Sequence, residues 1–191
     1  MSEIRELTTK EQCREKLPVF YGSRDNYKHG FREVLANACD EISNNFDSGQ
    51  VIVTLHEDNE TITVEDSGRG MPIEEVTNGK KNYKLLFETL FASTNYDNML
   101  LGKQTTGQNG VGLTVLNFSS KKFIVEVARK GKAYRISYAD GGVLKSFEEL
   151  GKNNSHYTKV TFQLDEEVYT NVKYDIEDIR DIVKSKSNMC Q

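Results

Sequence analysis

The chain has 191 residues, of which 37% are hydrophobic, and a formal net charge of −4 at pH 7. This length suits one large domain or two small ones, and nine Phe with nine Tyr can fill one substantial core. Because phosphate contact needs clustered Lys and Arg, the negative balance argues against a nucleic-acid-binding surface. Three scattered cysteines without metal-ligand spacing suit a reducing, cytoplasmic location, and we expect no signal peptide and no membrane-spanning segment.

The pattern of apolar and turn-forming residues predicts one α+β domain preceded by an arm. We expect residues 1–18, which are polar and end at Pro18, to form the arm, and residues 19–191 to form a single domain. In chain order, the expected elements are a helix at 29–46, a strand hairpin at 51–55 and 61–64, helices at 83–91 and 112–117, strands at 123–128, 133–138 and 159–164, and a helix at 175–184. The polar, aperiodic stretch at 92–106 has a length typical of functional loops.

The expected helix at 29–46 carries two opposed stripes of side chains. One stripe is apolar and suited to a core, and the other stacks carboxylate and amide groups over successive turns. The apolar stripe contains Phe31, Leu35, Ala38 and Ile42, and the polar stripe contains Glu33, Asn37, Asp40 and Glu41. A polar stripe of this kind usually faces solvent, so its functional meaning depends on two glycine-rich stretches further along the chain.

The first of these stretches, Asp66-Ser67-Gly68-Arg69-Gly70, follows the second expected strand and is called the aspartate box below. An ionised aspartate only accepts hydrogen bonds, so Asp66 is suited to an exocyclic amine such as that of adenine. Glycines let the backbone pass close to a flat ring where a Cβ would collide. The alternative interpretation is a tight turn in which Asp66 accepts hydrogen bonds from its own backbone.

The second stretch, Gly107-Gln108-Asn109-Gly110-Val111-Gly112, opens the next expected helix and is called the glycine box. Unencumbered N–H groups at a helix start can surround phosphate oxygens, although such glycines can also be simple hinges. The stretch is not a Walker loop, because Asp97 stands where the first glycine of that motif belongs. It is not a Rossmann turn either, because no strand leads directly into it.

The polar stripe of the helix at 29–46, the aspartate box and the glycine box are together called the three boxes. In this order they resemble the superfamily of gyrase, heat-shock chaperone, histidine kinase and mismatch-repair ATPases. In finer detail the chain is similar to the ATPase domain of type II DNA topoisomerases, that is, the gyrase B subunit and its topoisomerase IV counterpart. The matching features are Asp40-Glu41 after Asn37, Arg69 inside the aspartate box, Met71-Pro72 behind it, and residues 106–112. The resemblance runs from about residue 21 to residue 170.

The resemblance implies an α+β two-layer sandwich of the Bergerat type, with a mixed, mostly antiparallel sheet and helices on one face. It also implies Mg²⁺-dependent ATP hydrolysis that drives dimer closure with a second copy, and DNA strand passage. DNA and the cleavage subunit would be reached only through further domains, so we expect an N-terminal fragment. Such a fragment would bind ATP and competitive ATP-site inhibitors but turn over poorly, because a lysine from a following domain normally touches the γ-phosphate.

The resemblance also assigns roles to individual residues. Glu33 would be the general base, His29 would orient it, and Asn37 would hold Mg²⁺. Asp66 would bind the adenine amine, with Thr158 as a second hydroxyl contact near it, through water. The remaining nucleotide-binding positions would be Glu41, Gly70, Met71, Asn95, Gly107, Gln108, Asn109, Gly110, Val111 and Gly112. Arg69, Pro72 and Arg129 correspond to rim positions that contact aminocoumarin-type inhibitors, and Arg69 would pair with Glu41.

The chain departs from the common bacterial pattern at three places. Asn95 stands where a loop lysine usually reaches the phosphates, which is closer to the eukaryotic and phage branch; Lys103 is an alternative phosphate cation. Phe20 replaces a tyrosine that bonds nucleotide across the dimer in some members, and the usual Arg-Pro-Gly-Met entry is absent. The gyrase, topoisomerase IV and phage-like branches all stay open. The rival interpretations are a mismatch-repair or chaperone-like ATPase, a histidine kinase, and a stand-alone, non-hydrolysing nucleotide-binding regulator.

Overall fold

Six antiparallel strands form the main sheet of the computed structural model, which describes residues 5–92 and 111–187. The strand order is β1-β2-β8-β5-β6-β7, and each neighbouring pair is antiparallel. The strands are β1 (Val51–Leu55), β2 (Thr61–Asp66), β5 (Ser120–Arg129), β6 (Lys132–Ala139), β7 (Val143–Lys152) and β8 (Tyr157–Leu164). A small hairpin of β3 (Val76–Thr77) and β4 (Lys80–Lys81) lies outside this sheet.

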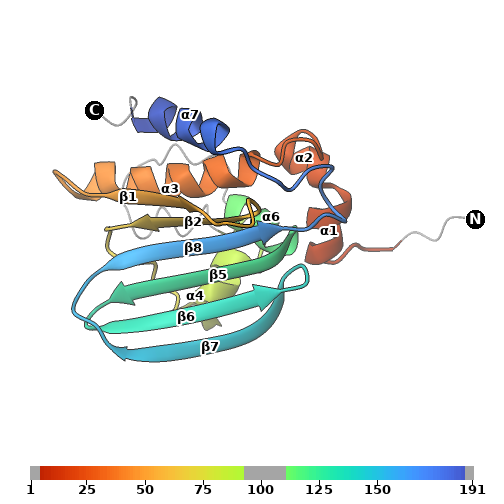
Figure 1. Cartoon of the computed structure of the whole chain (residues 1–191). Helices are drawn as coiled ribbons and strands as arrows, with labels where there is room; N and C mark the ends of the chain where they lie inside the picture. Colours follow the sequence, from red (N-terminus) through yellow and green to blue (C-terminus); the bar gives the residue numbers. More distant parts are fainter. Residues whose placement is uncertain (1–4, 93–110, 188–191) are drawn as a thin grey trace, which may run out of the picture.

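The helices gather behind one face of the sheet, as Figure 1 shows. They are α1 (Thr9–Glu15), α2 (Leu17–Tyr21), α3 (His29–Asn45), α4 (Asn82–Phe87), α6 (Gly112–Phe118) and α7 (Ile176–Ser187). The C-terminal helix α7 lies along α3, where Lys186 approaches the carboxylate of Asp40 to 3.6 Å. Among the described residues, no helix combines the length and the apolarity needed to cross a lipid bilayer. The expected two-layer α+β architecture is confirmed.

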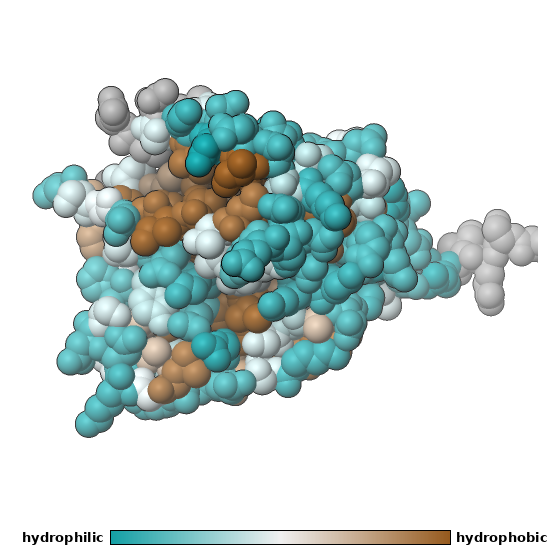
Figure 2. Space-filling model, viewed as in Figure 1, coloured by the Kyte–Doolittle hydropathy of each residue, from teal (hydrophilic) through white to brown (hydrophobic). Residues whose placement is uncertain are grey.

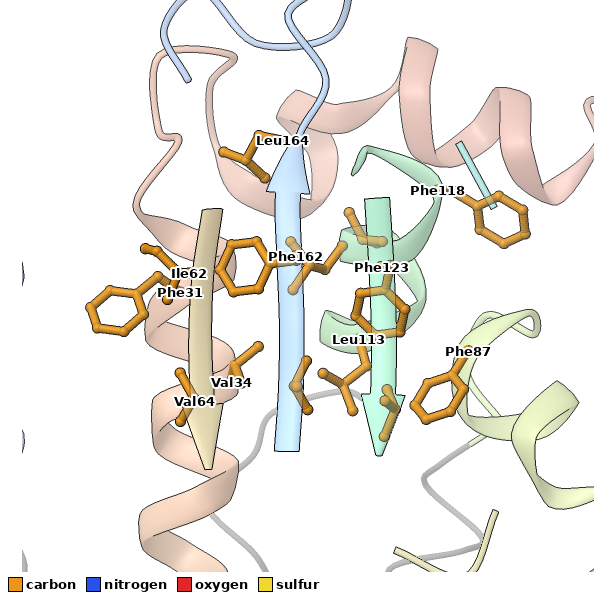
Figure 3. Close-up of a cluster of buried hydrophobic side chains, with 14 of the residues drawn as sticks. Phe31, Val34, Ile62, Val64, Phe87, Leu113, Phe118, Phe123, Phe162 and Leu164 are labelled. Atoms are coloured by element: carbon orange, nitrogen blue, oxygen red, sulfur yellow. The ribbon is translucent and has the colours of Figure 1, made fainter. Parts of the chain in front are cut away.

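The core consists of side chains that line up in rows across the sheet. One row runs through Ile62, Phe162, Phe123 and Tyr138, which are directly paired on neighbouring strands. All four are almost fully buried, and Figure 3 shows Phe31 and Val34 of α3 packing near Ile62, Val64 and Phe162. Fully burying a side chain of this size contributes roughly 1.5–3 kcal/mol.

The row next to the aspartate box is different, because polar groups replace apolar ones there. Beside the row just described lies a second apolar row, which contains Val64, Val160, Val125 and Ile136. The third row contains Val51, Asp66, Thr158 and Val127. Asp66 and Thr158 are 6% and 3% exposed, so both polar side chains are part of the buried layer. The sheet therefore presents a buried carboxylate and a buried hydroxyl at the point where the apolar core ends.

The opposite face of the sheet is open. Figure 2, viewed as in Figure 1, shows a mostly hydrophilic surface there with separate hydrophobic patches. A depression of about 350 Å³ lies over β1, β2 and β8. Its lining residues are Ile52, Thr54, His56, Thr63, Glu65, Lys159 and Thr161. These side chains alternate with the core-facing ones, so the depression lies across the sheet from Asp66.

Several features differ from the sequence-based expectation. The segment expected to be a polar arm contains α1 and the start of α2, and its Cys13 and Leu17 are fully buried. Thr8 and Glu11 form a capping box that starts α1, and Cys13, Leu17 and Tyr21 recur at a spacing of four residues, which places them toward the core. Strand β7 was not expected, and the helix expected at 83–91 is the shorter α4.

Candidate functional site

Helix α3 places four of the predicted site residues on successive turns of one face. His29 Nε2 lies 3.4 Å from Glu33 Oε1, and both side chains are about one-third exposed. Asn37 and Glu41 follow at intervals of four residues and are also half-buried. Phe31, Val34, Leu35 and Ala38 on the other face anchor the helix to the sheet. The polar stripe therefore has a fixed orientation.

The start of α6 lies directly against Glu33. A Cβ added to Gly112 would come within 2.6 Å of Glu33 Oε2, which is closer than real Cβ atoms approach other groups. A side chain here would force the Glu33 carboxylate to shift, so glycine leaves room for the carboxylate in its present position. The structure thus brings the end of the glycine box together with the polar stripe of α3. Residues Gly107, Gln108, Asn109 and Gly110 lie outside the described residues, as do Asn95 and Lys103.

Asp66 ends β2 as a buried carboxylate. Thr158 lies directly opposite on β8, and its hydroxyl accepts a hydrogen bond of 3.1 Å from the Met71 N–H. The Gly68 N–H donates to Asp66 Oδ1 at 2.9 Å. Burial raises the pKa of Asp66 from 3.8 to about 6, an effect that the Gly68 N–H opposes and the nearby charge of Glu41 reinforces. Both predicted adenine-binding side chains therefore lie together at one place.

The backbone of the aspartate box passes very close to β5 and β8. Gly70 has φ +79°, and a Cβ there would lie 2.5 Å from the Ala128 carbonyl oxygen, so a side chain does not fit. Arg129 donates from Nη1 to the Gly70 carbonyl at 3.2 Å and also pairs with Glu74 and Glu75. The predicted rim residue Pro72 is buried behind the box.

The expected ion pair between Arg69 and Glu41 is present and tightly formed. Arg69 donates from Nε to Oε1 and from Nη2 to Oε2, both at 2.8 Å, and its backbone N–H also donates to Oε1 at 2.9 Å. Burial alone would raise the Glu41 pKa, but these hydrogen bonds outweigh it and hold the pKa below its ordinary value. Three hydrogen bonds therefore join the aspartate box to α3, so the pair links two separate segments of the fold.

Two residues at this site were not predicted from the sequence. The His156 Nδ1–H donates to the carbonyls of Gly68 at 2.9 Å and Ser67 at 3.1 Å, and its ring stacks on Phe46 with centroids 5.9 Å apart. Tyr21 contacts His29 and Gly112. Their partners are mainly backbone carbonyls of distant segments, which have no residue-type signature. Only the position of His156, two residues before Thr158, could have drawn attention to it.

The described residues fit a nucleotide better than a metal centre formed by protein ligands alone. Within residues 5–92 and 111–187, no group of three or more His, Cys, Asp and Glu side chains could hold a metal ion. One end of the site offers a buried hydrogen-bond acceptor beside glycine backbone, which suits a flat heterocycle with an amine. The other end offers a carboxylate held by a histidine, which suits activation of a water molecule. Asn37 lies between them and offers a neutral oxygen ligand of the kind Mg²⁺ accepts.

Comparison with known proteins points the same way. Residues 22–168 match the family described as histidine kinase-, DNA gyrase B-, and HSP90-like ATPase. The chain is 33% identical to the B subunit of DNA gyrase from Thermus thermophilus over 184 residues, covering 94% of this chain and 28% of the relative. It is 34% identical to the B subunit of DNA topoisomerase 4 from Mycoplasma pneumoniae, covering 94% of this chain and 29% of the relative. The chain thus spans less than a third of the length of these relatives.

A solved structure shares the fold as well. The 43K ATPase domain of Thermus thermophilus gyrase B, solved in complex with an aminocoumarin, matches with a TM-score of 0.73 and 31% sequence identity. The match covers 94% of this chain and 45% of that chain. The fold, the three boxes in their expected order, and a family match over most of the sequence agree, so the chain belongs to the histidine kinase-, DNA gyrase B- and HSP90-like ATPase family.

Proposed function

We propose that this chain is the ATP-binding and ATP-hydrolysing domain of the gyrase B type of subunit in a type II DNA topoisomerase. The observation that carries the proposal is the placement of two carboxylates with different environments along α3 and β2. Asp66 is buried beside Thr158, and Glu33 is about one-third exposed beside His29 and the start of α6. The similarity to the B subunits of gyrase and topoisomerase IV supports this role over a mismatch-repair, chaperone-like or regulatory one.

At the adenine end, Asp66 accepts a hydrogen bond from the exocyclic amine of ATP. Its raised pKa means that the carboxylate is ionised, and therefore acceptor-only, above about pH 6. Thr158 adds a hydroxyl beside it, and Gly70 and Met71 leave room for the flat ring. The ion pair of Arg69 and Glu41 and the bond from Arg129 to the Gly70 carbonyl hold this loop in place.

At the phosphate end, Glu33 orients the attacking water and accepts its proton. His29, 3.4 Å away, fixes the direction of the carboxylate. Val111 and Gly112 are the described end of the glycine box, and we expect them to lie near the phosphates. The rest of the glycine box and Asn95 lie outside the described residues, and we expect them to contribute further phosphate contacts. Asn37 would hold Mg²⁺, which neutralises charge on the phosphate oxygens when bound.

In the longer protein, we propose that ATP-driven closure of two copies is coupled to DNA strand passage, while other domains hold DNA and the cleavage subunit. The isolated chain binds ATP and competitive inhibitors but hydrolyses ATP slowly. We expect Arg69 and Arg129 to form the rim that an aminocoumarin would contact, whereas Pro72, the third expected rim residue, is buried in this structure. The related Thermus domain was solved with an aminocoumarin bound.

Replacing Glu33 with Gln tests this function. The variant keeps the shape of the side chain but cannot accept a proton, so single-turnover hydrolysis of ATP should fall by about 100-fold or more while binding of a non-hydrolysable analogue changes little. Glu57→Gln, in the exposed turn between β1 and β2, is the matched control and should hydrolyse ATP at the original rate. Unchanged turnover in Glu33→Gln would exclude Glu33 as the base.

A further inference from the structure

Tyr21, the last residue of α2, packs against the catalytic pair proposed above. Its side chain is almost completely buried, at 3% exposure, and its ring lies against the imidazole of His29 with centroids 4.3 Å apart and planes inclined by 37°. His29 itself is about one-third exposed, and its Nε2 lies 3.4 Å from Glu33 Oε1. The imidazole therefore contacts both a buried ring and the carboxylate that it would orient.

The hydroxyl of Tyr21 makes a second, separate contact. It donates a hydrogen bond of 3.0 Å to the carbonyl of Gly112, at the start of α6. Burial raises the pKa of this hydroxyl well above 10, with smaller contributions from the charges of Tyr169 and Glu33, so it remains a donor at neutral pH. A phenylalanine would fill the same space, so packing alone does not require the hydroxyl.

These contacts close a ring of four residues. Tyr21 contacts His29, His29 contacts Glu33, Glu33 lies against Gly112, and Gly112 accepts the bond from Tyr21. The four residues come from three separate elements, α2, α3 and α6. A half-exposed histidine has several accessible rotamers, and a buried ring on one face removes most of them. These four linked residues would hold the Glu33 carboxylate at a fixed distance from the backbone of Gly112 at the start of α6.

We propose that Tyr21 is a positioning residue for ATP hydrolysis: its ring fixes His29 against Glu33, and its hydroxyl fixes the start of α6 relative to them. This inference rests on the proposed role of Glu33. It adds that the N-terminal helical segment, through α2, contributes directly to the geometry of the hydrolytic site.

Two substitutions separate the two contacts. Tyr21→Phe keeps the ring on His29 but loses the bond to Gly112, and its single-turnover rate should fall by about tenfold, with the affinity for a non-hydrolysable ATP analogue changed by less than about threefold. Tyr21→Leu also loses the ring, and its rate should fall by about 30-fold or more. Tyr174→Phe is the matched control, because that buried hydroxyl also donates to a backbone carbonyl, that of Tyr27, and should keep the original rate.

NMR of the His29 imidazole gives a readout that a merely structural role would not move. The Tyr21 ring shields the imidazole protons, so these resonances should move downfield in Tyr21→Leu and stay nearly in place in Tyr21→Phe. Hydrolysis at the control rate in both variants would overturn the proposal, and so would a lowered rate in Tyr21→Leu with an unmoved His29 signal. If Tyr21→Leu fails to fold, the rate of Tyr21→Phe decides alone.

The Glu33→Gln variant distinguishes failure of this inference from failure of the proposed function. If Glu33→Gln is inactive while both Tyr21 variants hydrolyse ATP normally, only the role of Tyr21 is wrong. If Glu33→Gln still hydrolyses ATP, the proposed function fails, and the role of Tyr21 fails with it.

Discussion

A single residue of the proposed site can carry a cost to folding, and Asp66 is the clearest example. Its carboxylate is 6% exposed, and burial raises its pKa from 3.8 to about 6. Below pH 3.8 it is protonated in both the folded and the unfolded chain, so it has no effect on stability. Between 3.8 and about 6 the unfolded chain ionises first, so stability falls as pH rises, and the full cost is present above about 6.

The substitution Asp66→Asn should therefore change stability and binding in opposite directions. Asparagine can still accept the Gly68 N–H but carries no charge to bury. We compare the free energy of unfolding of the variant with that of the original chain. The difference should grow in favour of the variant by on the order of 2–3 kcal/mol as the pH is raised from about 4 to about 7.5. Denaturant titrations at the two pH values measure this difference.

Binding of the same variant is measured with a non-hydrolysable ATP analogue and should be weakened strongly, because the amide places a donor near the adenine amine. Equal pH dependence of stability in the two proteins would contradict the burial cost. Unaltered nucleotide affinity would contradict the adenine assignment. The two results are independent, so each part of the interpretation of Asp66 can fail alone.

At the scale of elements, the short helices α1 and α2 are part of the core and not an appendage. Leu17 is fully buried, whereas Val19, two residues further along the same helix, is 78% exposed. Leu17→Ala should lower the free energy of unfolding by about 2–5 kcal/mol, because it leaves a cavity in the core. Val19→Ala should change it by about 0.5 kcal/mol or less. Equal, small effects of both substitutions would show that this segment folds as a separate arm.

An element can be predicted from the sequence where its own residues form a clear pattern of apolar, polar and turn-forming positions. The β1–β2 hairpin and α3 were predicted because β-branched runs flank a polar turn and because the apolar stripe of α3 has a clear helical period. Strand β7 was missed because it is an edge strand whose residues are mostly exposed on both faces. The arm was predicted at 1–18 because α1 is short and largely polar, and Cys13 with Leu17 gave too weak a pattern.

The site was predictable where side-chain chemistry identified it and unpredictable where backbone groups did. Asp66, Thr158 and the pair of Arg69 with Glu41 lie together as the resemblance implied. Tyr21 and His156 could not be found this way, because each depends on a carbonyl from a segment far away in the sequence. Only the packing of α2 against α6, and of β8 against the aspartate box, reveals them.

At the scale of the whole molecule, the position of the site follows from the sheet. Two apolar rows of side chains cross β2, β8, β5 and β6, and the next row begins the site with Asp66 and Thr158. The nucleotide would therefore lie against the same layer of helices and strands that forms the core. Ligand binding should accordingly stabilise the domain as a unit.

Thermal unfolding provides the test of this expectation. At a concentration about 100 times its Kd, a non-hydrolysable ATP analogue should stabilise the chain by about 2.7 kcal/mol, and an aminocoumarin should do the same. We propose that the two ligands share one pocket, so their effects should not add. Additive stabilisation by the pair would show that the rim formed by Arg69 and Arg129 is separate from the ATP pocket. Asp66→Asn, which lacks the adenine acceptor, is the control.

The buried carboxylate of Asp66 also bears on drug resistance. In the proposed binding mode, a compound that donates a hydrogen bond to this group would use the same acceptor as ATP. The substitution Asp66→Asn, which removes the charge but keeps an acceptor for the Gly68 N–H, would make the domain more stable, so misfolding would not eliminate this variant. It would be eliminated by the loss of ATP binding, because no other side chain in the buried row of β2 and β8 offers a charged acceptor. An inhibitor anchored at Asp66 therefore leaves its target little room to escape by mutation at the anchor itself.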